Sequence, residues 1–261
     1  MNPPASRADF RFYAELNDHL REEWRYKAIP RLFFVPGSVK DMIESCGVPH
    51  TEVELIIANG ESVDFSYVVR DGDRIAVYPM FESLDIAPEL LVRPAVLRDL
   101  TFVVDVHLGK LAAYLRMLGF DALYENSLAD SGLARISSEQ RRVLLTRDRG
   151  LLKHSMVTHG YWLRETESRR QLAEVVARFD LARSMRPFSR CMACNGPLEE
   201  VAKEQVRGRL PRRTAELHNR FQQCRQCARV YWAGSHRRRM QNWIGELTGS
   251  GGEAGPAKNG T

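Results

Sequence analysis

The chain has 261 residues, of which 44% are hydrophobic and 27% charged, a composition that supports a packed core and excludes global disorder. No apolar run approaches the roughly 20 residues that a membrane helix needs, and the start MNPPASRADF lacks the pattern of a secretory signal. We therefore expect a cytoplasmic protein with no membrane contact.

The net charge of +5 is unevenly distributed along the chain. Residues 1–95 carry −6, residues 96–185 carry +3 and residues 186–243 carry +9. This distribution favours separate modules, with a surface for a polyanion at the C-terminal end. An arginine-rich surface that only keeps the protein in solution is the alternative.

Residues 8–82 contain the elements of a small mixed domain. In chain order we expect a strand over 10–16, a strand over 31–35, a helix over 39–46 capped by Ser38, strands on both sides of an Asn59-Gly60 turn, and a last strand over 74–78. This is the element order of a β-grasp, and together with the string DGDRIAVYP it resembles the ubiquitin-like family that includes small sulfur carriers. Those carriers end in Gly-Gly, which is missing here, so the resemblance implies a docking, positioning or purely structural role.

The remaining boundaries follow from composition. Residues 83–98 contain two prolines and are expected to form a connector, and the Gly-rich residues 245–261 a disordered tail. Between them we expect an α/β domain with a parallel sheet over 99–185 and a small zinc ribbon over 186–244.

Two apolar strands in the α/β region are each followed by an aspartate. FVV precedes Asp105, and VLLT precedes Arg147 and Asp148. Between the two strands, leucines at helical spacing between 108 and 118 predict a helix that Gly119 can end, and a second helical stretch follows with Asp130 near its amino end. If the strands are parallel neighbours, Asp105 and Asp148 face one crevice at the carboxyl edge of the sheet.

Converging carboxylates repel each other unless a divalent cation neutralises them, and oxygen ligands suit Mg²⁺ or Mn²⁺. Such a site can polarise a phosphodiester for hydrolysis. Single aspartates in these positions are also common as helix caps or turn residues, and spacing alone leaves that alternative open. The basic residues close in sequence that could hold the scissile phosphate or offset charge in the transition state are Lys110, Arg116, Arg147 and Arg149.

Four of the five cysteines form two C-x-x-C pairs, Cys191/Cys194 and Cys224/Cys227. Two such pairs predict one tetrahedral zinc, which is structural because four sulfurs leave no open position; a redox dithiol pair is the weaker alternative. Arginines beside aromatic residues in the same segment, including Arg212, Arg213 and Arg237, suit phosphate pairing and base stacking. For Trp232 the alternative to base stacking is a purely structural role, in which it only packs the ribbon.

The strings VVDVHLGKLAAYLRMLGFDALY, RRVLLTRDRGLL, PFSRCMACNGPL and CRQCARVYWAGSH resemble, in this order, the RNase domain family named after the C-terminal part of the Mut-7 exonuclease, a branch of the PIN-like nucleases. In that family the domain is also found after a ubiquitin-like domain. The resemblance implies a metal-dependent ribonuclease with Asp105, Asp130 and Asp148 as acidic metal ligands, and Thr146 as the small polar residue of the T-R-D motif.

Three functional hypotheses follow. The first is a ribonuclease in which the acidic residues hold Mg²⁺ or Mn²⁺, Lys110 assists catalysis and the basic zinc ribbon holds single-stranded RNA. The second is an RNA-binding protein without cleavage. The third is an adaptor that binds a protein partner through the ubiquitin-like domain, in which case residues 1–90 should be removable with little effect on cleavage.

Overall fold

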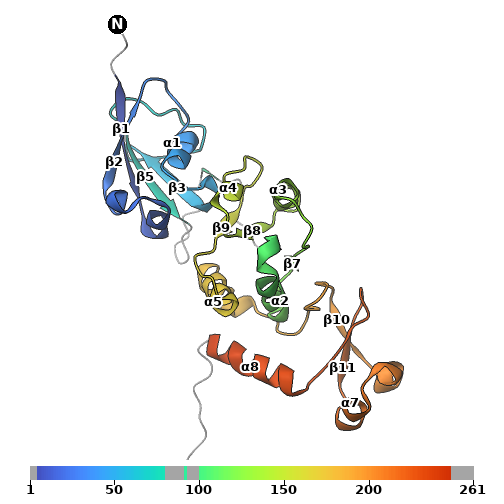
Figure 1. The fold of residues 1–261 in the computed structure, drawn as a ribbon. Helices are drawn as coiled ribbons and strands as arrows, with labels where there is room; N and C mark the ends of the chain where they lie inside the picture. The colour runs from blue at the N-terminus through green and yellow to red at the C-terminus, as the bar shows by residue number, and fades with distance from the viewer. Residues whose placement is uncertain (1–4, 80–90, 93–99, 248–261) are drawn as a thin grey trace, which may run out of the picture. The chain divides into compact units, whose positions relative to one another are not determined.

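The computed structural model describes residues 5–79, 91–92 and 100–247 (Figure 1). The chain divides into two compact units, Met1–His107 with Tyr124–Arg164, and Leu108–Leu123 with Glu165–Thr261. The expected connector lies outside the described residues except for 91–92, and the expected tail except for 245–247, which end a helix. Within the described residues no helix has the length and apolar character that crossing a membrane requires.

The N-terminal part of the first unit is a five-stranded mixed sheet (Figure 1). Its elements are β1 (Ser6–Phe12), β2 (Ala28–Phe33), α1 (Val39–Ser45), β3 (Val53–Ala58), β4 (Glu61–Val63) and β5 (Arg74–Pro79), with short 3-10 helices at Ala14–His19, Glu22–Trp24 and His50–Glu52. The strand order is β2-β1-β5-β3-β4, and β1 and β5 run parallel. The predicted element order is confirmed, and α1 packs its buried residues into the core of this sheet.

Local sequence signals fix the ends of these elements. Ser38 caps α1 by accepting a hydrogen bond from the Asp41 amide (3.1 Å), as expected. Asn59 and Gly60 join β3 to β4 with φ angles of 52° and 95°, the left-handed pair that a two-residue hairpin turn requires.

The first strand begins and ends four residues earlier than predicted. The alternation that begins at Phe10 continues to Leu16, but β1 ends at Phe12 and a 3-10 helix follows. The Asn17 side-chain amide donates to the carbonyls of Phe12 (3.0 Å) and Ala14 (2.9 Å). These carbonyls therefore have a side chain as their hydrogen-bond donor where a continued strand would have a neighbouring strand. Leu16 is still fully buried, which explains why its spacing imitates a strand.

The second part of the first unit contains three parallel strands, in the order β6-β8-β9. They are β6 (Phe102–Val104), β8 (Val143–Thr146) and β9 (Gly160–Trp162), with α3 (Asp130–Glu139) before β8, α4 (Arg149–Leu152) after it, and a 3-10 turn at Val106–Leu108. Every residue of β6 and β8 is buried, as their continuous apolar sequence predicts.

The second unit combines helices with a small antiparallel sheet. Its elements are α2 (Gly109–Met117), β7 (Ala122–Leu123), α5 (Ser168–Arg178), β10 (Leu198–Val201), α6 (Lys203–Val206), α7 (Arg212–Leu217), β11 (Phe221–Cys224), β12 (Val230–Trp232) and α8 (Ser235–Leu247), with 3-10 helices at Leu181–Ser184 and Arg207–Arg209. The sheet order is β10-β11-β12, and α2 packs against α5.

Gly119, which is predicted to end α2, is required there. Its φ is +96°, and a Cβ at this position would lie 2.2 Å from the Arg186 carbonyl oxygen. Any side chain would therefore displace the segment that leads into the cysteine-containing sheet.

Candidate functional site

One buried hydroxyl links the ends of β6 and β8. The parallel register pairs Val104 with Leu145, so the next residues along the two strands are Asp105 and Thr146. Thr146 Oγ1 donates to Asp105 Oδ2 (2.5 Å) and accepts from the Asp148 amide (2.9 Å). Asp105 is only 7% exposed and Thr146 is fully buried. Parallel strand ends and this hydroxyl therefore hold the two aspartates at one edge of the sheet.

Asp148 and Asp130 both lie at helix starts. Asp148 is the N-cap of α4, and its Oδ1 accepts from the Gly150 amide (2.7 Å). Asp130 is the first residue of α3 and is exposed. The capping role that the sequence left open is thus present at Asp148, and it is compatible with a second role because a carboxylate has two oxygens.

Among the described residues, a set of three or more potential metal ligands within 4.8 Å of one another occurs at the four cysteines. Asp105, Asp130 and Asp148 do not form such a set. Their donor type still fits Mg²⁺ or Mn²⁺, because carboxylate oxygens are the ligands that these hard cations prefer.

The arginines of the T-R-D region are held by carbonyls and an aromatic ring. Arg147 is exposed, and its Nη1 donates to the Arg164 carbonyl (3.0 Å). The Arg149 guanidinium lies 4.3 Å from the Trp162 ring centroid. Both guanidinium groups therefore remain at the carboxyl edge of the sheet. Lys110 is exposed in the first turn of α2.

Arg116 has a different environment from the other candidate basic residues. It is 4% exposed, and its guanidinium donates to the carbonyls of Ala122 (2.9 Å), Met192 (3.2 Å) and Ala193 (2.9 Å). These bonds fasten the first cysteine pair to the turn after α2. This position gives Arg116 a structural role, so we do not include it among the proposed substrate contacts.

Glu52, from the N-terminal sheet domain, reaches the end of β9. Its carboxylate accepts from His19 Nε2 (2.8 Å) and from the Trp162 amide (2.6 Å), and Arg164 Nη2 lies 3.5 Å away. The side chains of Glu52 and His19 are fully buried. Burial alone would raise the pKa of Glu52, but the His19 hydrogen bond and the electrostatic interactions with His19 and Arg164 outweigh it and lower that pKa.

Further contacts join the same two parts of the first unit. Arg164 donates to Asp18 Oδ2 (2.8 Å), Lys153 Nζ to the Glu44 carbonyl (2.8 Å), and His50 Nε2 lies 2.8 Å from the Val157 carbonyl. The His19 and Trp162 rings are 5.1 Å apart. The N-terminal domain therefore packs directly against the segments that follow β8.

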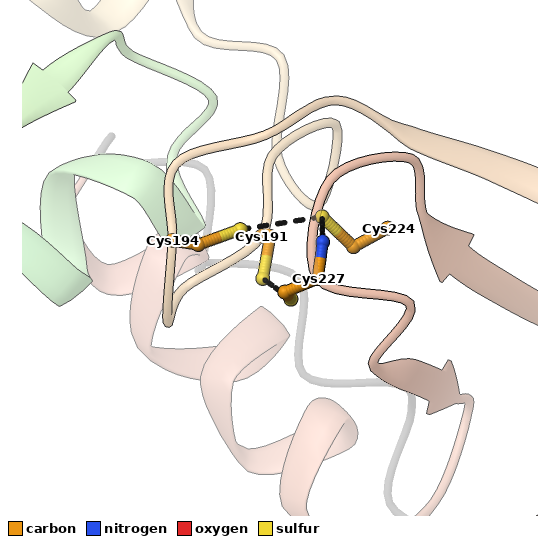
Figure 2. Close-up of side chains that lie close together, drawn as sticks. All are labelled: Cys191, Cys194, Cys224 and Cys227. Carbon is orange, nitrogen blue, oxygen red and sulfur yellow. Dashed lines mark hydrogen bonds between the residues drawn. The ribbon is translucent and has the colours of Figure 1, made fainter.

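The four cysteines converge as two similar turns (Figure 2). In the first turn the Cys191 amide donates to the Gly196 carbonyl and Asn195 has a positive φ; in the second, the Cys224 amide donates to the Arg229 carbonyl and Ala228 has a positive φ. The Sγ atoms of Cys191 and Cys227 are 3.6 Å apart, and those of Cys194 and Cys224 are 3.3 Å apart.

These sulfur distances fit a zinc ion. Tetrahedral zinc with Zn–S bonds of about 2.3 Å separates its sulfurs by about 3.8 Å, within ~0.5 Å of the separations observed. Burial alone would raise the pKa of Cys191, but hydrogen bonds from the Tyr231 hydroxyl and from the Cys194 and Ala193 amides lower it to about 6. Cys191 is therefore surrounded by donors that stabilise its thiolate, the form that binds metal.

The arginines predicted to bind substrate on the ribbon lie in two environments. Arg212 and Arg213 are exposed on α7, and Arg212 pairs with Glu216 one turn later (3.2 Å). Arg237 is half-buried, with its guanidinium 4.4 Å from the Phe188 ring centroid and Nη1 donating to Gln222 Oε1 (2.9 Å).

Several of these contacts carry no signal in the sequence. Sequence reasoning missed Glu52 and His19, because Glu52 and its partners His19 and Trp162 are 33 and 110 residues apart. It also missed Asn195, whose side chain accepts from the Ala122 amide (3.2 Å) and donates to Asp121 (2.8 Å), which ties the first cysteine turn to β7. An asparagine directly after a C-x-x-C pair is the one local clue to a left-handed turn residue.

Comparison with protein families agrees with this arrangement. Residues 5–85 match the family model described as Mut7-C ubiquitin, and residues 100–244 match the model described as Mut7-C RNAse domain. No curated protein and no solved structure matches the chain significantly. The second family match spans more than half of the chain. The chain therefore belongs to the Mut7-C RNAse domain family, with a Mut7-C ubiquitin domain ahead of the RNAse domain.

Proposed function

We propose that this protein is a metal-dependent ribonuclease that hydrolyses phosphodiester bonds in single-stranded RNA. Membership of a ribonuclease family supports the reaction class. The observation that carries the proposal is the Thr146 hydroxyl, which joins the Asp105 carboxylate to the Asp148 backbone at the carboxyl ends of two parallel strands. That edge is where open α/β sheets bind ligands.

In this proposal Asp105, Asp130 and Asp148 bind Mg²⁺ or Mn²⁺. When bound, the ion supplies Lewis-acid polarisation of the phosphodiester. Thr146 is a positioning residue, because its hydroxyl fixes one oxygen of Asp105. Lys110, Arg147 and Arg149 pair with phosphate oxygens of the substrate and offset the charge that develops in the transition state.

The four cysteines hold a structural Zn²⁺, and the ribbon binds the RNA strand through Arg212, Arg213 and Arg237. Residues 186–243 carry a net charge of +9, and they keep about +7 when four thiolates bind one zinc ion. Single-stranded RNA is the substrate class that suits arginines interspersed with aromatic residues. Because the zinc site needs reduced thiols, we propose the cytoplasm as the place of action.

A protein partner at the ubiquitin-like domain is a further part of the proposal. β2 is an edge strand, and Leu32 on it is 68% exposed. Phe34 and Val35, directly after it, are 69% and 76% exposed. Large apolar side chains along a sheet edge that has no partner strand among the described residues favour pairing with another polypeptide.

The test is cleavage of end-labelled single-stranded RNA by the full chain with Mn²⁺. Asp105→Asn and Asp148→Asn should abolish cleavage and leave RNA affinity within about twofold, since neither removes a basic residue. Asn caps helices as well as Asp does, so Asp148→Asn preserves the start of α4 while removing charge. Glu139→Gln, at the other end of α3 from Asp130, is the matched control and should cleave normally.

Cleavage by both aspartate variants at the parental rate would contradict the proposal. It would favour the RNA-binding alternative, in which Asp148 acts only as the helix cap that the structure shows. The lengths of the labelled products distinguish stepwise removal of nucleotides from internal cleavage in the same assay.

A further inference from the structure

The described part of the second unit contains a cavity of about 480 Å³ formed by the strands of the cysteine-containing sheet and the start of α8. Small-molecule sites in proteins typically enclose about 300–1,000 Å³, so the cavity is large enough for a nucleotide. The lining residues on which the argument rests are Met192, Arg229, Tyr231, Trp232, Arg237 and Met240.

One wall of the cavity is aromatic and apolar. Trp232 ends β12 and is half-buried, and Met192 and Met240 line the cavity from the first cysteine turn and from α8. The Tyr231 hydroxyl lies 3.1 Å from Cys191 Sγ. The cysteine centre therefore holds Tyr231, the residue before Trp232 in β12, and so limits the movement of this strand.

The charged side chains that line the cavity are arginines. Arg190, Arg229 and Arg237 line it, and no aspartate or glutamate is among the described residues that do. Arg237 is held in place by Phe188 and Gln222, while its buried Nε has no hydrogen-bond partner among the described residues. A buried donor without an acceptor is costly, and an anionic oxygen entering the cavity would satisfy it.

We infer that this cavity binds one unstacked base of single-stranded RNA together with its adjoining phosphate. The base stacks on the wall formed by Trp232, and the phosphate pairs with Arg229 and Arg237. The inference rests on the proposed function only in taking RNA as the ligand. An acidic peptide would satisfy the arginines equally well, but it has no flat π-surface for the aromatic wall, so the combination favours a nucleotide.

The experiment compares two labelled hexamers by fluorescence anisotropy, oligoadenylate RNA and a chain of abasic units with the same number of phosphates. Asp105→Asn protein without added Mg²⁺ or Mn²⁺ is used, so that cleavage plays no part. We expect about tenfold tighter binding of the oligoadenylate, the order that one stacked base supplies.

Two variants assign this preference to the cavity. Trp232→Ala removes the stacking surface and should reduce the preference to less than twofold, whereas Trp232→Phe keeps an aromatic face and should retain most of the preference. Arg229→Gln should weaken both hexamers alike. Arg220→Gln, an exposed arginine of the same segment outside the cavity, is the control and should keep the full preference. Each variant must retain the zinc content of its parent, which shows that the ribbon is folded.

Equal binding of the two hexamers by the parent, or an unchanged preference in Trp232→Ala, would overturn the inference. Displacement of the abasic hexamer by hexaglutamate, with no preference for bases, would instead assign the cavity to acidic peptides and overturn it too. A protein that keeps the base preference but never cleaves RNA would refute the proposed function and leave this site intact.

Discussion

Glu52 is the residue at which the structure makes its sharpest energetic prediction. Its buried carboxylate accepts hydrogen bonds from His19 and from the Trp162 amide, and lies 3.5 Å from Arg164. Glu52→Gln keeps the shape of the side chain but removes the negative charge that the buried His19 and the half-buried Arg164 face. Removing one member of a buried ion pair typically costs about 3–5 kcal/mol. Because glutamine can still accept from the Trp162 amide, we expect the lower end, about 3 kcal/mol.

The measurement is urea unfolding of the full chain, followed by tryptophan emission, since Trp162 lies beside His19 at this contact. For a unit of about 150 residues, 3 kcal/mol corresponds to a fall in melting temperature of roughly 6–12 °C. Glu61→Gln, an exposed carboxylate on β4, is the matched control and should change stability by less than about 0.5 kcal/mol.

A double-mutant cycle with Arg164→Gln tests the cause. If the two charges interact as the structure indicates, Arg164→Gln should cost less in the Glu52→Gln background than in the parent. A loss of less than about 1 kcal/mol for Glu52→Gln, or strictly additive effects, would refute the view that this carboxylate holds the two parts of the first unit together.

Acidification should reveal the contribution of the Glu52 carboxylate to stability. Because folding lowers the pKa of Glu52, this contribution is present above the unfolded-state pKa of about 4.5 and is lost as the pH falls below it. In urea titrations below pH 4.5, the stability of the parent should therefore fall more steeply than that of Glu52→Gln. Thr146→Val should lower kcat far more than it raises KM in the RNA cleavage assay, whereas Thr146→Ser should keep activity; equal rates for both would remove the positioning role. Elemental analysis should find one zinc per chain, lost in Cys194→Ser and retained in Cys46→Ala, whose thiol is buried in the other unit. Joint replacement of Arg212 and Arg213 by Gln should make RNA affinity less sensitive to salt. The slope of log affinity against log salt concentration should become shallower by about 0.7 for each phosphate that the variant no longer neutralises. An unchanged slope would exclude these arginines from the RNA surface.

Features fixed by neighbours in the chain were predictable from the sequence. The cap at Ser38, the Asn59-Gly60 turn and the end of α2 at Gly119 each depend on a local conformation that few residues adopt. The two cysteine pairs likewise converge as expected, since metal ligands at this spacing have few other uses.

Features that depend on distant residues were not predictable in the same way. The alternation from Phe10 to Leu16 placed the end of the first strand four residues too late, because a buried 3-10 helix can present apolar residues at similar intervals. The environment of Arg116 was also invisible to sequence reasoning: its carbonyl partners at 192 and 193 lie 76 and 77 residues away. Charge near a proposed site in sequence therefore did not distinguish a substrate contact from a buried structural residue.

The contacts of the N-terminal domain change how its role is understood. As an adaptor it should be separable from the RNAse domain, yet the Trp162 amide, the Val157 carbonyl and Lys153 all have their partners in the N-terminal domain. Removing that domain would expose these groups together with the apolar segments around them. Since Trp162 stacks with Arg149, one residue after Asp148, the loss would reach the edge of the sheet where the proposed metal ligands lie. The ubiquitin-like domain therefore supports the segment that carries the candidate active site, and a partner bound to its β2 edge would contact a domain that packs against that segment.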